Sequence, residues 1–256
     1  MAMLASENVS FGKLAELIEK DTVVAGNVLR MVNSALYGRR GEVSSVRHAV
    51  SLMGVVKLRN TVMTLSMSQM WNSVRMPKGW NSARFNQHAV GVAVMADLIA
   101  QKADIDYPEG AFVAGLLHDI GLLLLGIALP GEFVEIRRLH EAGGRPVHEC
   151  EEEVLGLGHA ELSAVALHRW NLPDQIQKAV RYQHRPTGRT GGQHSLSLAL
   201  HVADSAVSQL GLTALDGERE SREDPEEMLA SIGLNGQWPA LRDQFEHEFE
   251  PMKSFF

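Results

Sequence analysis

Apolar residues recur along most of the chain at steps of three and four positions, which is the spacing of one face of an α-helix. A clear example between positions 82 and 102 is the stripe formed by Phe85, His88, Val92, Met95 and Ile99. No segment keeps the strict alternation of apolar and polar residues that is typical of a half-buried β-strand. The pattern therefore predicts an all-α protein.

Capping residues and helix breakers divide this pattern into separate helices. Asp21-Thr22 and Ser44-Ser45 are suited to helix starts, whereas Gly54 and several prolines interrupt the periodicity. Helices are expected over 11–18, 23–32, 46–53, from 55 past 67, and over 82–102, 108–118, 130–143, 149–155, 159–170, 173–184, 195–210, 225–232 and 239–249. The segment 186–192 is expected to be a flexible loop.

The turn-forming sequence Pro77-Lys78-Gly79 predicts a connector between two helical lobes that meet near 76–81. Residues 1–76 are expected to form an N-terminal helical lobe, and residues 81–212 a second lobe with the candidate site. Residues 213–256 are more polar and acidic and are expected to form a helical tail. We assign all three parts to one domain over 1–256.

Several polar residues interrupt apolar helix faces, and they are candidates for one site. They are His88, His118, Asp119, His159, His184 and Asp204. A carboxylate among leucines, such as Asp119, is costly unless a partner or a metal ion compensates its charge. Taken singly, each residue is better explained as a core histidine bonded to a carbonyl group or as a paired acid. Together they form a ligand set for one or two divalent ions, which could activate water for phosphoester hydrolysis.

The order of these residues resembles the H…HD…D metal pattern of the HD superfamily. His88, His118, Asp119 and Asp204 supply that pattern, and His159 and His184 stand where HD-GYP phosphodiesterases have further histidines. A closer resemblance, to the HDOD domain, covers nearly the whole chain. It is carried by Ile18-Glu19-Lys20-Asp21, by the stretches 28–35 and 46–54, and by Trp170-Asn171-Leu172-Pro173. This resemblance implies an HD-superfamily multi-helix bundle with an N-terminal helical lobe, acting as a signalling or regulatory module.

The chain departs from the HD-GYP pattern at three places. Leu122 stands where those enzymes usually carry a lysine, so a cation that could hold a substrate phosphate is missing. Gln183-His184 replaces a pair of histidines, and no GYP segment follows. Arg185 and Arg189 could replace the lysine, but we expect their glycine-containing loop to be mobile, and a mobile cation contributes little to catalysis.

Composition narrows the class of protein further. Hydrophobic residues make up 45% of the 256 positions, which is enough for a sizeable core. The one cysteine, Cys150, excludes an internal disulfide bond and indicates a reducing compartment. There is no signal-peptide pattern at the N-terminus, and the apolar run near 120–129 is shorter than a membrane-spanning helix. We therefore expect a cytoplasmic protein that does not associate with membranes.

The net charge of −7 is unevenly distributed, with +5 over residues 1–80 and −12 over residues 81–256. Arg39, Arg40 and Arg47 are candidates for binding a small anion or an acidic protein surface, although a solvated basic face explains them as well. The acidic remainder would repel a nucleic-acid backbone, so no strong nucleic-acid binding is expected.

Three functions fit these observations. We favour a regulatory module that binds a divalent metal (Fe, Mn, Ni, Zn or Mg, as one ion, two or none) or a small anionic ligand such as a nucleotide, and acts on a signalling protein partner. The alternative is a metal-dependent phosphohydrolase for a nucleotide or cyclic dinucleotide; the retained ligands argue for it, and Leu122 argues against it. A nucleic-acid binder is the third, with Arg39, Arg40, Arg47, Lys57 and Arg59 as its contacts.

Overall fold

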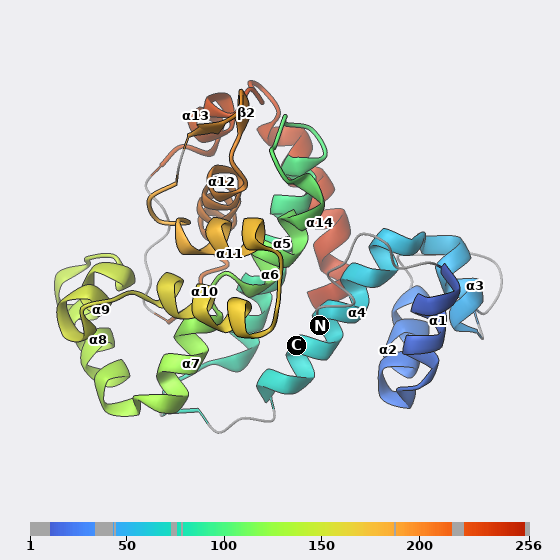
Figure 1. Ribbon diagram of the computed structural model, residues 1–256, viewed down its shortest axis with the longest axis horizontal. Coiled ribbons are helices and arrows are strands. Elements are labelled where there is room, and N and C mark those ends of the chain that lie inside the picture. Colours follow the sequence, from blue (N-terminus) through green and yellow to red (C-terminus); the bar gives the residue numbers. More distant parts are fainter. Residues whose placement is uncertain are drawn as a thin grey trace.

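The computed structural model describes residues 11–33, 43, 45–72, 76–77, 79–186, 188–216 and 223–253. Arg39 and Arg40, two of the three candidates for anion binding, lie outside these residues. The described part is almost entirely helical (Figure 1), which confirms the prediction of an all-α protein.

The helices fall into a smaller and a larger group, which lie to the right and to the left in Figure 1. The smaller group consists of α1 (Phe11–Glu19), α2 (Thr22–Val32) and α3 (Val46–Met53). The long helix α4 (Val55–Asn72) connects it to the larger group. The larger group begins with α5 (Ser82–Ala100), the 3-10 helix η2 (Pro108–Gly110), α6 (Ala111–Leu117), α7 (Ile120–Ala128), α8 (Pro130–Gly143) and α9 (Val147–Leu155). It continues with α10 (His159–Arg169), α11 (Asp174–Arg181), α12 (Leu196–Gln209), α13 (Pro225–Ser231) and α14 (Trp238–Lys253).

Each group surrounds its own core, and α4 contributes to both. The smaller core contains Ala15, Ile18, Val24, Val28, Val32, Val43, Val46, Ala49, Leu58, Val62 and Leu65. Met63 and Met67 of the same α4 belong to the larger core instead. The predicted junction at 76–81 is therefore the connection from α4 to α5. The boundary between the two cores lies earlier in the chain, along α4 itself. A helix that is buried on opposite sides has no single apolar stripe from which that boundary could be predicted.

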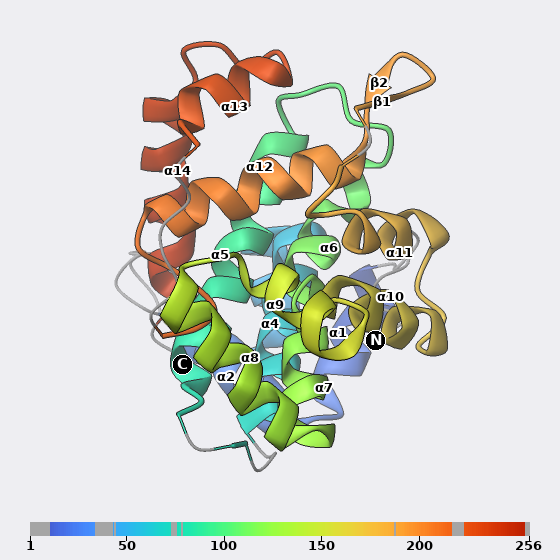
Figure 2. The ribbon, with the colours of Figure 1, turned by 90° about the vertical axis from the view of Figure 1, so that its left-hand side faces the viewer.

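Helix α5 is the centre of the larger core, with α6, α12 and α14 packed against it (Figure 2). Leu241, Phe245 and Phe249 of α14 are buried in this core. The acidic segment 213–256, predicted to be a helical tail, thus helps to complete the larger core through α14. None of its described acidic residues is buried.

Helices α5 and α6 approach each other closely at Gly115. A Cβ atom at this position would lie 2.6 Å from the Cα atom of Ala93, so glycine is required by the contact. The stretch Pro108–Ala128, which includes α6 and α7, is long and apolar enough to span a membrane by composition, but 83% of its most apolar window is buried inside the molecule. It serves here as core.

The segment 186–192, expected to be a flexible loop, instead leads into a short antiparallel hairpin of β1 (Arg189–Thr190) and β2 (Gln193–His194). Gly191 and Gly192 form its turn with φ angles of 61° and 97°, which suit the tight turns of hairpins. The backbone N–H of His194 donates to Asp104 O at 2.9 Å, and its carbonyl accepts from Asp106 N–H. The Gly-Gly pair was the sequence signal for this turn.

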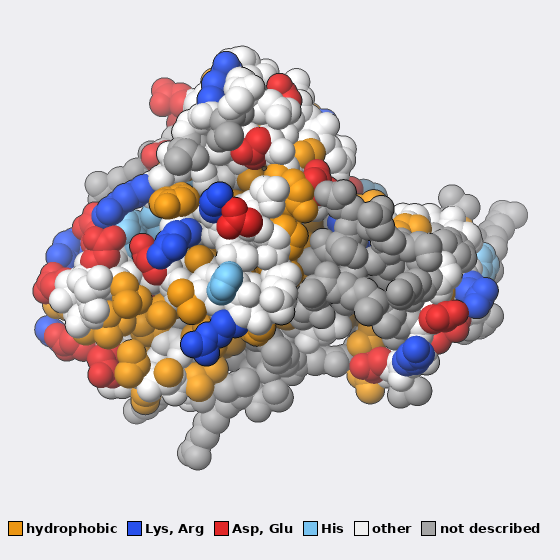
Figure 3. Space-filling model, in the orientation of Figure 1, with side chains coloured by type: hydrophobic (Ala, Val, Ile, Leu, Met, Phe, Trp, Pro, Cys, Tyr) orange, Lys and Arg blue, Asp and Glu red, His pale blue; other side chains and the backbone are white. Residues whose placement is uncertain are grey.

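Apolar side chains also gather on the surface, over the corner where α7 and α8 lie (Figure 3). Ile127, Leu129 and Val134 of this region are exposed by 40%, 39% and 54%. An apolar surface of this kind is typical of a contact site for another macromolecule.

Candidate metal centre

The His118-Asp119 dipeptide lies in the turn between α6 and α7, and both residues are buried. This turn directs the two adjacent side chains to the same side, with His118 Nε2 only 3.3 Å from Asp119 Oδ2. Helix α10 supports the turn from outside, because Gly121 N–H donates to Ser163 Oγ at 2.8 Å. The carboxylate is thus fixed inside the core, beside a second histidine from α5.

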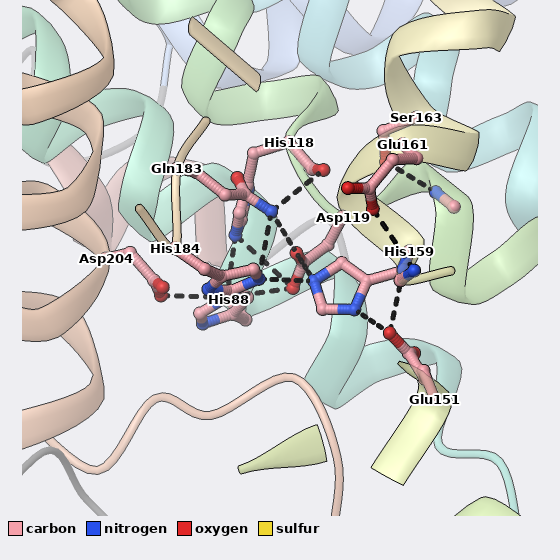
Figure 4. Close-up of polar contacts among 12 residues, drawn as sticks. His88, His118, Asp119, Glu151, His159, Glu161, Ser163, Gln183, His184 and Asp204 are labelled. Carbon is pink, nitrogen blue, oxygen red and sulfur yellow. Dashed lines mark hydrogen bonds and ion pairs between the residues drawn. The ribbon is translucent and has the colours of Figure 1, made fainter. Parts of the chain in front are cut away.

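His88, His118 and Asp119 direct three ligand atoms at one point (Figure 4). The Nε2 atoms of His88 and His118 are 3.2 Å apart, and His88 Nε2 is 3.5 Å from Asp119 Oδ2. Asp204 of α12 adds a fourth group, with Oδ1 3.4 Å from His88 Nε2. The Asp204 side chain is 25% exposed and lies on the open side of the cluster. Two imidazole nitrogens and two carboxylates suit a divalent transition metal.

The hydrogen bonds behind the two histidines fix which nitrogen faces inward. His88 Nδ1 lies 2.8 Å from Leu212 O, and His118 Nδ1 lies 2.8 Å from Gly115 O. A carbonyl oxygen can only accept, so each Nδ1 carries a hydrogen, and each Nε2 faces into the cluster. In the neutral form of each ring, this Nε2 atom offers a lone pair next to the carboxylate. The donor set therefore fits a metal ion.

A second group of ligand atoms lies on the other side of Asp119. Asp119 Oδ1 is 3.2 Å from His159 Nε2, and His184 Nε2 is 2.8 Å from the same nitrogen. Behind His159, Glu151 Oε2 accepts from both its Nδ1 and its backbone N–H, at 2.6 and 2.7 Å. The two oxygens of Asp119 thus face two different sets of histidines, which is the geometry of a bridging carboxylate.

Burial and neighbouring charges act in opposite directions on these groups. Burial favours a raised pKa for Asp119, but His118 and His159 outweigh it and hold the pKa well below the usual value. Burial alone would lower the pKa of His159, yet Glu151 and Asp119 raise it well above the usual value. Burial, with His159 and His148 nearby, lowers the pKa of His184. Asp119 is therefore ionised, and His184 is neutral and able to act as a ligand.

The cluster opens into a cavity of about 520 Å³. Its lining is His88, Asp119, Leu122, His140, Gly144, Arg145, Pro146, Val147, His148, His159, His184, His201, Asp204, Ser205, Ser208 and Glu223. Five of the six predicted metal ligands line it, and His118 is fully buried behind them. Arg47 is exposed on α3 and does not line this cavity. All six residues thus meet at one place, and their binding of metal stays a prediction.

The predicted cations Arg185 and Arg189 do not line the cavity either. Arg185 is 73% exposed and pairs with Glu152 at 3.0 Å. Among the residues that the structure describes, Arg145 is the one arginine or lysine in the lining, and it is paired with Glu153 at 2.7 Å. Leu122 is part of the lining as well, so an apolar side chain stands where HD-GYP enzymes usually have a lysine.

Sequence reasoning missed several polar residues of this site. Glu151 stands in the acidic run 149–153 and resembles its solvated neighbours, although it is fully buried. His148 stacks on His184 with ring centroids 4.3 Å apart, and Gln183 Nε2 lies 3.3 Å from Asp119 Oδ1. The sequence has no local signal that separates Glu151 from its acidic neighbours.

The fold and this buried His/Asp cluster together resemble an HD-superfamily protein. Residues 1–186 match the family model of the HDOD domain, and the chain therefore belongs to the HDOD domain family. The match ends before α12, so Asp204 lies beyond it.

A curated relative from Treponema pallidum (strain Nichols), an uncharacterized protein, is 24% identical over 237 residues. The aligned region covers 91% of this chain but 44% of that protein, so the chain spans less than half of its relative's length.

Three solved structures share the fold. An HDOD domain protein of unknown function from Geobacter sulfurreducens has a TM-score of 0.78 at 22% identity, covering 98% of this chain and 87% of its own. A candidate signal transduction protein from Marinobacter aquaeolei VT8 has a TM-score of 0.78 at 22% identity, covering 99% of this chain and 56% of its own. A candidate phosphohydrolase from Shewanella amazonensis SB2B has a TM-score of 0.74 at 24% identity, covering 99% of this chain and 91% of its own.

Proposed function

We propose that this chain is a regulatory module of signal transduction whose His/Asp cluster binds a divalent metal ion. One observation carries the proposal: the Nε2 atoms of His88 and His118, 3.2 Å apart, both face the Asp119 carboxylate while a carbonyl oxygen holds each Nδ1. A metal ion fits among these atoms, and mixed nitrogen and oxygen ligands suit Fe, Mn, Ni or Zn better than Mg. The similarity of fold to the Marinobacter protein supports the role in signalling.

The same cavity is the proposed place for a small anionic ligand such as a nucleotide. A metal ion would supply positive charge at its inner end, and Arg145 lines its wall. Asp119, Asp204 and Glu223 line it too, so without the metal an anion would be repelled. Ligand binding is thus proposed to depend on the metal.

We favour a sensor over an enzyme because the cavity is poor in groups that stabilise developing negative charge. Hydrolysis of a phosphoester needs an activated water, a held phosphate and preorganised positive charge. The ligand cluster could supply the first. For the other two the chain offers Leu122 in place of a lysine, and Arg145, which is already paired with Glu153.

The second candidate function is a metal-dependent phosphohydrolase. Asp119 favours it, because its two oxygens face His88 and His118 on one side and His159 on the other. If each of these two sets held a metal ion, the ions would supply the chemistry that activates water for hydrolysis. The Shewanella protein, which shares the fold, is described as a candidate phosphohydrolase.

Metal analysis of protein purified without chelators tests the proposal. We expect about one to two equivalents of a transition metal in the wild type and little in Asp119→Ala, since the bridging ligand is lost. Asp174→Asn is the matched control, because Asp174 is exposed on α11 and pairs with Lys178 at the surface. Equal metal content in wild type and Asp119→Ala would reject the site.

A turnover assay separates the two functions. Protein loaded with Mn, Fe or Ni is offered cyclic dinucleotides, nucleotides and simple phosphodiesters. We expect binding with little or no turnover. Clear hydrolysis that disappears in His118→Ala would establish the phosphohydrolase instead.

A protein partner is proposed to contact the exposed apolar surface around Ile127, Leu129 and Val134.

A further inference from the structure

A second cavity, of about 260 Å³, lies where the smaller lobe meets the larger one. Its wall combines the start of α4 with residues of α5, α6 and α14. The lining residues of most use here are Lys57 and Asn60 of α4, Asp97 of α5, Phe112 of α6, and Glu248 and Met252 of α14. None of them belongs to the His/Asp cluster.

Acidic side chains outnumber basic ones in the lining of this cavity. Asp97 and Glu248 each bring a carboxylate, and among the described residues Lys57 is the one arginine or lysine that lines it. Lys57 Nζ lies 3.5 Å from Glu248 Oε1, so the ammonium is already engaged. Asp97 Oδ2 accepts from Gln101 Nε2 at 2.9 Å, and Arg59 and Lys57 act on this carboxylate through their charge. The described lining therefore has two carboxylates for one ammonium group.

A buried acceptor without a partner lines the same cavity. Asn60 is 4% exposed, and its Oδ1 atom has no hydrogen-bond partner among the described residues. A buried carbonyl oxygen that accepts no hydrogen bond is costly, so native structures seldom leave one unless a ligand or water serves it. This observation is independent of the carboxylates, and it also indicates a hydrogen-bond donor.

The remaining wall is apolar. Val94, Phe112 and Met252 are buried in the larger core and line this cavity. A ligand that fits must therefore combine N–H donors and positive charge with an apolar body. An anion would meet two carboxylates, and a hydrocarbon would offer no hydrogen-bond donor to Asn60 Oδ1.

We propose that this cavity between the lobes binds a small organic cation, namely a primary amine with a short apolar chain. The ammonium group binds Asp97 and Glu248, and the chain lies against Phe112 and Met252. The pKa of Asp97 supports this assignment: burial and the nearby Glu248 raise it, despite Gln101, Arg59 and Lys57. A bound ammonium group would relieve that cost.

Such a ligand would influence how the two lobes pack. Lys57 and Asn60 are on α4, which contributes to both cores, whereas Asp97 and Glu248 belong to helices of the larger lobe. An amine that pairs with Glu248 competes with Lys57 for this carboxylate across the junction. The cavity is thus a control point for lobe packing, and it does not depend on whether the His/Asp cluster binds metal.

Isothermal titration of the full chain at neutral pH with three matched probes tests the proposal: n-hexylamine, n-hexanol and hexanoate. We expect one saturable site for n-hexylamine and binding weaker by about tenfold or more for the other two, because charge-assisted hydrogen bonds are lost. Asp97→Asn and Glu248→Gln should each weaken n-hexylamine binding by about tenfold or more. Circular dichroism checks that both variants fold.

Two control variants locate the binding. Glu223→Gln removes a carboxylate from the other cavity, and Glu250→Gln removes an exposed one from α14. Both should bind n-hexylamine as the wild type does. Equal affinity for all three probes, preference for hexanoate, loss of binding in Glu223→Gln but not in Asp97→Asn, or no binding at all would each overturn the proposal.

Discussion

Glu151 holds His159 from behind, as carboxylates commonly hold metal-binding histidines. Its Oε2 atom accepts from the ring and from the backbone of His159, so it fixes both the ring orientation and the protonated nitrogen. The Nε2 atom thereby faces Asp119 and His184, and it would offer its lone pair to a metal ion once it has given up its own proton. The electrostatics of the centre thus depend on a residue that touches no metal.

Glu151→Gln should therefore weaken metal binding without removing a ligand. An amide keeps the size of the side chain but loses the charge that raises the basicity of His159, and such changes reduce metal affinity by about 10- to 100-fold. Titration of chelator-treated protein with Mn²⁺ measures the effect. Glu152→Gln is the control, because Glu152 is the next residue in α9 but lies on the surface and pairs with Arg185. Equal affinities in the two variants would reject a positioning role.

The sequence predicted the six candidate ligands because each interrupts an apolar face, whereas Glu151 interrupts nothing. It stands among Glu149, Glu152 and Glu153, and only the fold shows that one of these four is fully buried. Burial of a single acid in an acidic helix depends on the register of α9 against α10. That register is set by tertiary packing, which local periodicity does not contain.

The raised pKa of Asp97 predicts how the stability of the fold depends on pH. Burial and Glu248 make the folded protein hold this proton more tightly than the unfolded chain, whose value is near 3.8. Stability must then fall as the pH rises from that value through the raised one. The Asp97→Asn variant has no carboxyl group here and should not lose this stability. The difference in free energy of unfolding between the variant and the wild type should therefore shift in favour of the variant as the pH rises, and level off by neutral pH.

Urea unfolding of wild type and Asp97→Asn at several values between pH 4 and pH 7 measures this difference. Glu250→Gln, on the exposed side of α14, is the control and should show no such trend. A difference that stays constant with pH would mean that Asp97 has its ordinary pKa in the folded state.

At the scale of elements, the contact of α5 with α6 depends on the absence of one side chain. A Cβ atom on Gly115 would lie 2.6 to 2.8 Å from backbone atoms of Ala93 and Val92, and backbone cannot move aside cheaply. Gly115→Ala should therefore force the helices apart and lower the free energy of unfolding by about 1–3 kcal/mol.

Gly131→Ala supplies the matched comparison for this substitution. Gly131 is also helical, but nothing lies within 4 Å of a Cβ atom placed there. Alanine is the better helix former, so this variant should be as stable as wild type or more stable by up to about 1 kcal/mol. Chemical denaturation of both variants decides; a Gly115→Ala variant as stable as Gly131→Ala would contradict the close contact.

Most helices lie where periodicity and caps predict them, because amphipathic segments reveal their own limits. The failures occur where a different force decides. The break after α6 was predicted at 118, but α7 (Ile120–Ala128) was not among the predicted helices, because its continuous apolar sequence has no helical periodicity. The hairpin at 189–194 is too short for alternation to appear, and its backbone hydrogen bonds to Asp104 and Asp106 are non-local.

At the scale of the whole molecule, α4 makes the two lobes interdependent. Leu58 near its start is buried in the smaller core, and Met63 and Met67 are buried in the larger one. The Lys57–Glu248 ion pair adds a contact between α4 and α14. If the smaller core is lost, the start of α4 loses its packing, and the contacts that this helix makes with the larger core are weakened as well.

The chain should therefore unfold in one transition that includes both lobes. Leu58→Ala leaves a cavity in the smaller core and should lower the free energy of unfolding by about 2–5 kcal/mol. Because α4 is shared, the larger lobe should lose stability with it. Hydrogen exchange along a urea gradient, read by mass spectrometry, should show α2 and α12 losing protection at the same lowered urea concentration. Val165→Ala, at an exposed position of α10, should leave both midpoints unchanged. Early unfolding of α2 while α12 keeps its wild-type midpoint would show that the lobes are independent, and a ligand between them could then not influence the His/Asp centre through α4.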